Sequence, residues 1–357
     1  MWKLIIYALA LSCLGVLMAA APRAAEDLTI IQITDDSRVD RHPDISGSTV
    51  VWEHCEGEGW PCPDGDYEIY LWENGSTTNI SNNDTDDSFP AISGSKVVWQ
   101  HDDGNDSEIY VWDGATITQI TNNSRADQIP AISGSTVVWE GCDAGSGSDC
   151  LYGDFEIYLW DGVTTTRITN NSTDDRFPAV SGSNVVWFAR DGSIDDDEEI
   201  YLWDGVTTTQ ITNNSVDDAV PDIYGSNVAW QRWIESNFEW EICLWNGVSI
   251  TQIANHDLND WSPDLSGSNV VWEGCGDWYP CQIFLWDGST TTQIRENVDG
   301  DYRPAISGSN FVWYGHDGSD YEIYMATIPE PLPALPIAGL AALTGLLGIA
   351  GWRRLRG

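Results

Sequence analysis

The sequence predicts an all-β fold, a seven-bladed β-propeller with four-stranded antiparallel blades. Two repeated phrases and their period indicate this. Gly-Ser-x-Val-x-Trp occurs seven times at spacings of 40 to 48 residues, with Phe311 replacing Val in the last copy. Glu-Ile-Tyr-Leu-Trp follows each copy, in strict or looser form. Short strands repeating every forty-odd residues are the signature of propeller blades. The glycines that open the first phrase are Gly47, Gly94, Gly134, Gly182, Gly225, Gly267 and Gly308.

One repeat shows how a blade forms. Residues 178–181, 184–187, 199–203 and 207–212 are rich in Val, Ile, Thr, Tyr and Trp, which favour pleated strands. Ser-Gly-Ser separates the first two runs, and Asp204-Gly205 separates the last two. We expect tight hairpins with positive φ at both Asx-Gly residues. The same slot holds Asn74-Gly75, Asp113-Gly114, Asp161-Gly162, Asn246-Gly247 and Asp287-Gly288.

The two ends of the repeat array predict that the ring closes on itself. Residues 28–34 form a lone outer-strand phrase before the first Gly-Ser copy. The last repeat stops after its third strand, residues 322–327. The first strand therefore completes the last blade, which removes open sheet edges that would favour aggregation.

The tryptophans are expected to form the core between blades. The chain has 20 Trp, and 13 of them occupy the two repeated Trp positions. Each aromatic side chain buries roughly 150–250 Å². This favours a structural role for these 13 residues over a ligand-binding stripe.

Residues 1–25 are predicted to form a secretory signal peptide, with Lys3 before an apolar run and Ala19-Ala20-Ala21 near the cleavage site. The propeller is then expected over residues 26–328 and a tail over 329–357. Residues 332–352 are apolar apart from Thr344, and Arg353, Arg354 and Arg356 follow. This length predicts a C-terminal transmembrane helix with the arginines on the cytoplasmic side.

Pro329, Glu330 and Pro331 stand directly before that apolar stretch. This trio, a single hydrophobic helix and an arginine cluster resemble the PEP-CTERM sorting tail of bacterial surface proteins. The resemblance implies an exosortase-type processing enzyme as a partner. It also implies export, membrane anchoring by the helix and then display at the cell surface or in the extracellular matrix. A plain C-terminal anchor is the alternative.

Six cysteines outside the leader form close pairs between the second and third strands of their repeats. We expect the disulfides Cys55–Cys62, Cys142–Cys150 and Cys275–Cys281, which an oxidising compartment permits. Cys243 replaces a strand tyrosine and is expected to be a buried free thiol.

The formal net charge is −41. Residues 26–328 contain 10 basic and 55 acidic side chains, which excludes nucleic acid and anionic lipid as partners. Strand order sends the long, acidic connections to one face of the ring, where function usually resides. The aspartate pairs Asp86-Asp87, Asp174-Asp175 and Asp217-Asp218 are interpreted as turns between blades.

Aromatic residues outside the repeat fall on the same loops, which suits carbohydrate stacking or a cationic ligand. Small cores under long loops are the alternative. The candidates for ligand binding are Trp60, Trp233, Trp240, Trp261, Trp278 and Tyr279. The sequence indicates no cofactor other than calcium, for which hard oxygen ligands cluster in two loops. The candidate metal ligands are Asp102, Asp103, Asp195, Asp196 and Asp197.

The repeat resembles that of the TolB-like propellers. Asp191-Gly192 with Ile200-Tyr201, and Asp317-Gly318 with Ile323-Tyr324, show their Asp-Gly-x-x-x-Ile-Tyr phrase most clearly. The chain departs from that family by having Ser-Gly-Ser at the first turn. The resemblance covers about residues 28–327 and implies the propeller fold.

Catalytic signals are weak. The histidines show no shared spacing, and no hydrolase elbow or metalloprotease phrase occurs. Three hypotheses remain: a non-enzymatic surface propeller that binds extracellular polysaccharide or a surface protein, a propeller-type glycan hydrolase or lyase, and a structural display module without a small ligand. The first is favoured. The histidines are His42, His54, His101, His256 and His316.

Overall fold

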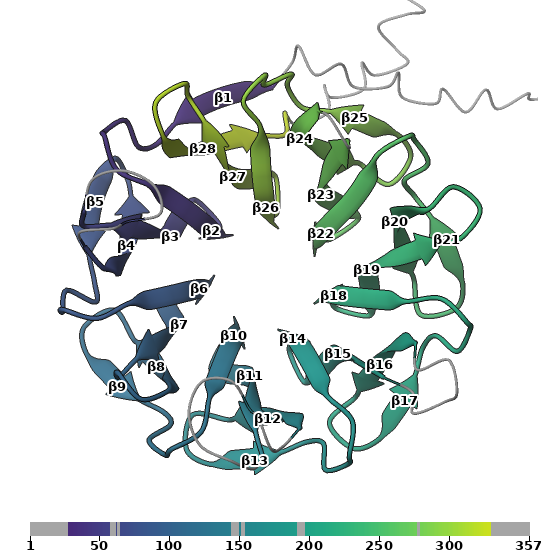
Figure 1. Ribbon diagram of the computed structural model, residues 1–357, viewed down its shortest axis with the longest axis horizontal. Coiled ribbons are helices and arrows are strands. Elements are labelled where there is room, and N and C mark those ends of the chain that lie inside the picture. The colour runs from purple at the N-terminus through teal and green to yellow at the C-terminus, as the bar shows by residue number, and fades with distance from the viewer. Residues whose placement is uncertain are drawn as a thin grey trace, which may run out of the picture.

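The structure is a computed structural model that describes residues 28–329 except 58–61, 63–64, 144–149, 151–153, 191–196 and 277–278. Within these residues, seven four-stranded antiparallel sheets are arranged radially around a central axis (Figure 1). The seven-bladed all-β prediction is confirmed. The expected leader and the tail from Glu330 onward lie outside the described residues.

Each blade is an antiparallel meander, with its first strand nearest the axis (Figure 1). The inner strands are β2 (Asp40–Ser46), β6 (Asp87–Ser93), β10 (Asp127–Ser133), β14 (Asp175–Ser181), β18 (Asp218–Tyr224), β22 (Asn259–Ser266) and β26 (Asp301–Ser307). The second strands are β3 (Thr49–Cys55), β7 (Lys96–Asp102), β11 (Thr136–Cys142), β15 (Asn184–Arg190), β19 (Asn227–Ile234), β23 (Asn269–Gly276) and β27 (Asn310–His316).

The outer half of each blade completes the meander. The third strands are β4 (Tyr67–Glu73), β8 (Ser107–Trp112), β12 (Phe155–Trp160), β16 (Glu198–Trp203), β20 (Glu239–Trp245), β24 (Tyr279–Trp286) and β28 (Tyr321–Thr327). The outer strands are β5 (Ser76–Asn79), β9 (Ile117–Gln119), β13 (Thr165–Arg167), β17 (Thr208–Gln210), β21 (Ile250–Gln252), β25 (Thr291–Gln293) and β1 (Thr29–Gln32). We number the blades 1 to 7 from β2 to β26. The loop rim is the end that carries the second-to-third connections and the connections between blades, and the turn rim is the opposite end.

The N-terminal strand closes the ring as predicted. β1 pairs antiparallel with β28, from Thr29 opposite Thr327 to Gln32 opposite Tyr324. The Ile33 N–H then donates to the Ile323 carbonyl at 2.7 Å, and the Ile323 N–H donates to Thr34 Oγ1 at 2.9 Å. Blade 7 is thus built from both ends of the described chain.

The repeated tryptophans of the second strands are the largest buried side chains of the core, as expected. All seven are at most 1% exposed. Trp52, for example, packs with Ile45 of its own blade and with Val312 and Ile323 of blade 7. The tryptophans that end the third strands are only half-buried, because they stand nearer the outer edge.

The second aspartate of each Asp-Asp pair is a strand residue, so the interpretation of these pairs as turns is wrong for it. Asp87, Asp175 and Asp218 are buried at the start of inner strands. Asp87 accepts the Trp99 indole N–H at 2.7 Å. Burial of a carboxylate requires such donors, and the Trp beside it supplies one.

The hairpin prediction holds in full only for Asn74-Gly75, where both residues have positive φ and Glu73 pairs with Ser76. At the five Asp-Gly and Asn-Gly slots that follow, the loop has four residues. In the loop after β8, Asp113 Oδ1 accepts the Thr116 N–H at 2.8 Å, and only Gly114 has positive φ. The aspartate caps the loop through its side chain, so it does not need the left-handed backbone.

The three predicted disulfides are present, with Cα–Cα separations of 5.8, 5.5 and 4.1 Å. Cys243 is a buried free thiol, also as predicted. Cys55 and Cys62 pack with Val39 and Tyr67, so this disulfide anchors a small apolar cluster at the loop rim.

We predict that Ile33→Pro loosens the closure. Proline removes the N–H that bonds Ile323, and leaving that carbonyl unpaired costs about 1–3 kcal/mol. Urea unfolding monitored by tryptophan fluorescence should show a lower midpoint than for the control Ile33→Val, which keeps the bond. Equal midpoints for the two variants would contradict the role of this bond in closure.

Candidate functional site

The inner strands share a strained feature at mid-length. In each, the residue before a proline has a positive φ between 44° and 52°. Left-handed backbone costs a non-glycine residue roughly 1–2 kcal/mol. The ladder register shifts at the same place, so each inner strand carries a bulge. These seven bulge residues are His42, Phe89, Ile129, Phe177, Val220, Ser262 and Arg303.

Side chains from the preceding blade hold several bulges in place. Glu53 accepts the Phe89 N–H at 2.7 Å, and Glu140 accepts the Phe177 N–H at 2.7 Å. Glu273 accepts the Arg303 N–H at 2.8 Å. Each carboxylate follows the repeated Trp of its second strand. These bonds cross from one blade to the next, and they offset the strain of the bulges.

The bulge residues line a central cavity of about 460 Å³. Its wall is largely apolar, with the prolines and Phe89, Ile129, Phe177 and Val220. The polar side chains that line the cavity include those of His42, Arg303 and Gln231. An apolar cavity with a few placed polar groups is the usual form of a ligand site.

Glu53 supplies a fixed negative charge beside this cavity. Burial by itself would raise its pKa, but His42 and Arg41 together lower the pKa below its ordinary value. His42 Nδ1 lies 2.8 Å from one carboxylate oxygen, and Arg41 Nε lies 2.7 Å from the other. The carboxylate is therefore ionised and fully engaged by its neighbours.

Three of the predicted ligand-binding aromatics form one cluster on the loop rim of blades 5 and 6. The Trp240 ring lies 5.7 Å from that of Trp233 and 5.3 Å from that of Trp261, between ring centres. All three are half-buried, and Phe238 beside them is 73% exposed. Trp261 also lines the central cavity, so the cluster is continuous with it. We call Trp233, Trp240 and Trp261 the aromatic cluster.

The other predicted aromatics are not tested by the structure. Trp60, Trp278 and the side chain of Tyr279 lie outside the described residues. Conversely, sequence reasoning missed the bulge residues that line the cavity. The signal was present, because an x-Pro dipeptide recurs in each inner strand.

The predicted metal ligands divide into three cases. Asp103 lies in a cluster with Asp106 and Glu108, in which one carboxylate oxygen from each lies within 4.8 Å of the others. Asp102 lies outside that cluster and accepts the Gly104 N–H at 2.8 Å. Asp197 is buried but joins no such cluster among the described residues, and Asp195 and Asp196 lie outside them.

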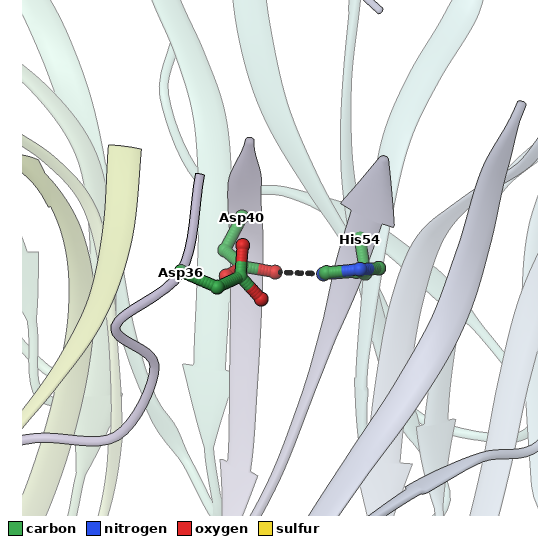
Figure 2. A group of neighbouring side chains, drawn as sticks. All are labelled: Asp36, Asp40 and His54. Carbon is green, nitrogen blue, oxygen red and sulfur yellow. Dashed lines mark hydrogen bonds and ion pairs between the residues drawn. The ribbon is translucent and has the colours of Figure 1, made fainter. Parts of the chain in front are cut away.

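Two further polar clusters flank the closure between blades 7 and 1. One contains Asp35, Asp317 and Glu322. The other contains Asp36, Asp40 and His54, with Asp36 and Asp40 side by side and the His54 ring facing Asp40 (Figure 2). His54 Nδ1 lies 2.7 Å from Asp40 Oδ1, which also accepts the Trp52 indole N–H at 2.6 Å. The His54 imidazole therefore has a structural role, as a hydrogen-bond partner of the buried Asp40 carboxylate.

His101 repeats this arrangement one blade later, 2.8 Å from Asp87. His54 and His101 both follow the repeated Trp by two residues, so the expectation that the histidines share no spacing is wrong for this pair. The aspartates raise the pKa of both histidines, although burial opposes the rise.

Blades 5 and 6 meet at a pair of buried carboxylates, Glu241 and Asp260. Within the described residues, no protonated histidine neutralises this pair. His256 Nε2 lies 3.5 Å from Asp260, but burial lowers the pKa of His256, so the ring is neutral at pH 7. Burial raises the pKa of Glu241 to about 7. Burial and the neighbouring Glu241 raise that of Asp260 further.

No helix long and apolar enough to cross a membrane occurs in the part of the chain that the structure describes. The predicted helix over residues 332–352 lies outside that part.

No protein-family model and no curated protein matches this chain. Similar solved structures include the S511A mutant of a puromycin hydrolase complexed with PGG, at 12% identity over 85% of this chain and 53% of the other, with a TM-score of 0.61. A puromycin-hydrolysing peptidase of Mycobacterium tuberculosis is 12% identical over 89% and 56%, with a TM-score of 0.59. TolB of Acinetobacter baumannii is 17% identical over 67% and 62%, with a TM-score of 0.48.

These likenesses show the fold alone. The chain spans about half the length of each of the two peptidases. At 12% identity, the fold shared with the two peptidases does not decide between an enzyme and a binding protein.

We predict that stability falls as pH rises through the raised pKa values at the junction of blades 5 and 6. The stabilising contribution of Asp260 and Glu241 is fully present below their ordinary pKa of about 4. It is lost as the folded-state carboxylates ionise towards pH 9. Asp260→Asn keeps an acceptor for Trp272 and removes a carboxyl group that folding must keep protonated at a pH where the unfolded chain ionises it. The substitution should therefore raise the free energy of unfolding at pH 8.5 by about 1–3 kcal/mol.

Urea unfolding at pH 5.5 and pH 8.5 measures this effect. The control is Asp287→Asn, at a half-buried aspartate whose carboxylate accepts the Ser289 and Thr290 N–H groups, where no such gain is expected. A variant Asp260→Asn that is no more stable than the parent at pH 8.5 would show that the pair is not strained by its charge.

Proposed function

We propose that this chain is an exported, non-enzymatic β-propeller that binds an extracellular polysaccharide at the aromatic cluster and the adjoining central cavity. One observation carries this: three half-buried tryptophans stand together at the loop rim, and one of them lines the cavity. Half-buried indole rings present an apolar face to solvent while remaining fixed by packing.

Sugar rings suit this surface for two reasons. Their C–H faces stack on indole, and their hydroxyl groups donate to carboxylates, which the chain carries in excess. The continuity of the cluster with an apolar cavity favours a chain that lies across the rim and enters the centre. A large negative charge favours neutral or amino sugars over acidic ones.

The bonding of the histidines supports a binding role rather than catalysis. His42, His54 and His101 are each engaged by a buried carboxylate that serves a blade or a junction. The alternative, a glycan hydrolase or lyase, predicts turnover of the bound polysaccharide. An assay for new reducing ends separates the two.

Export is supported by the three disulfides, because such bonds persist in oxidising compartments. The signal peptide, the exosortase-type processing and the membrane anchor rest on the sequence phrases at the two ends. Together they support display of the propeller at the cell surface or in the matrix.

We predict that Trp240→Ala weakens binding to a panel of immobilised neutral and amino-sugar polysaccharides at least tenfold. Trp240 lies between the other two rings, so its loss divides the stacking surface. Tyr224→Ala, at an exposed aromatic on the turn rim, is the matched control and should leave binding unchanged. Equal binding by both variants and the parent, with circular dichroism unchanged, would exclude the aromatic cluster as the site.

We predict further that protein recovered from the native cell surface ends near residues 329–331. Intact-mass spectrometry of the C-terminus measures this. A mature chain that retains Arg353 to Arg356 would favour the plain anchor instead.

A further inference from the structure

The second-to-third connection carries three acidic residues at matching positions in four blades. One follows the second strand, one stands two residues before the repeated Glu, and the third is that Glu. The first two are joined by the same backbone bond in every case, with N···O distances of 2.9 to 3.1 Å. These acidic triads are Glu56, Asp66 and Glu68; Asp103, Asp106 and Glu108; Asp143, Asp154 and Glu156; and Asp317, Asp320 and Glu322.

Arginine neutralises the triads of blades 1 and 3. In blade 3, Arg167 Nη2 lies 2.6 Å from Glu156 and 3.3 Å from Asp143, so one guanidinium joins two members. In blade 1, Arg38 lies 3.0 Å from Glu56. Arg38 comes from the segment between β1 and β2, and the residue of blade 1 equivalent to Arg167 is Asn79, so the two arginines approach their triads from different positions.

The triads of blades 2 and 7 have an uncharged residue in the place of Arg167. Arg167 pairs with Tyr158, and the equivalent partners of Tyr110 and Tyr324 are Gln119 and Gln32. No ion pair between these two triads and a lysine or arginine occurs among the described residues. Within the described residues, the triads of blades 2 and 7 therefore lack an arginine contact of the kind seen in blades 1 and 3.

The blade 2 triad also contains buried acceptors without donors. Asp106 is 2% exposed, and neither of its carboxylate oxygens has a hydrogen-bond partner among the described residues. Glu108 is fully buried. A buried carboxylate that lacks hydrogen-bond donors is stabilised by a metal ion.

In blade 7, the close cluster contains Asp35 in place of the middle triad member, Asp320. Oxygens of Asp317 and Glu322 lie within 4.8 Å of each other and of an oxygen of Asp35. Glu322 is fully buried, and its Oε2 has no hydrogen-bond partner within the described chain. Asp35 belongs to the segment that follows β1, so an ion here would tie the closing strand to blade 7.

We propose that Asp103, Asp106 and Glu108 in blade 2, and Asp35, Asp317 and Glu322 in blade 7, each bind one calcium ion. Calcium takes six to eight oxygen ligands in flexible geometry, whereas magnesium requires a near-ideal octahedron and keeps its waters. Three carboxylates from a loop and a strand suit the former. This inference goes beyond the proposed polysaccharide binding and does not depend on it.

Isothermal titration of the metal-free full chain with calcium chloride, without polysaccharide, tests the proposal. We expect two sites per chain. Asp106→Asn should remove the first and Asp317→Asn the second, with at least a tenfold loss of affinity at the altered site. Asp154→Asn, in the arginine-filled triad of blade 3, is the matched control and should leave two sites.

Circular dichroism confirms that each variant is folded. Two sites that persist in both Asp106→Asn and Asp317→Asn would overturn the proposal.

Discussion

The structure depends on a hydrogen bond from a buried tryptophan to a buried aspartate. In six of the seven blades, within the described residues, the Trp indole N–H donates to the first aspartate of the inner strand, at 2.5 to 2.8 Å. In blade 7, Arg295 replaces the indole as the donor and forms hydrogen bonds to both carboxylate oxygens of Asp301. This bond fixes the largest core side chain of a blade to the strand that faces the axis. As a consequence, every blade buries the carboxylate of an inner-strand aspartate.

The other polar contacts between neighbouring blades form because these carboxylates are buried. A buried carboxylate needs further donors, so the connection between blades supplies an asparagine. Asn83 Nδ2 donates to Asp87 at 2.6 Å, and its backbone N–H donates to Glu68 at 2.7 Å. Asn123, Asn171 and Asn214 repeat the first of these bonds. The path of each connection is therefore set by the acids beneath it. Where histidine or arginine is missing, the charge remains to be balanced by a proton or by a metal ion.

The same connections form the rim on which the site stands. In blade 5, the hairpin between the second and third strands is one residue pair longer than the acidic hairpin of blade 2, and it carries Trp233 and Trp240. Trp261, at the next inner strand, brings this cluster to the cavity. A rigid ring of nearly identical sheets thus keeps its repeat in the core and varies its loops, which is how such scaffolds carry a site.

The sequence alone determined the number of blades, their closure, the buried tryptophans and the disulfides, because each depends on local patterns that recur with the repeat. It could not show the bulges before the prolines, since a left-handed Ile129 or Val220 contradicts local preference and is held by bonds from a neighbouring blade. It also misread Asp87, whose place in a strand depends on the Trp99 side chain twelve residues away. The meeting of Trp240 with Trp261, and of Asp35 with Asp317, joins residues of different blades or of opposite ends of the chain. Only the closed ring decides such contacts, because only tertiary packing brings these positions together.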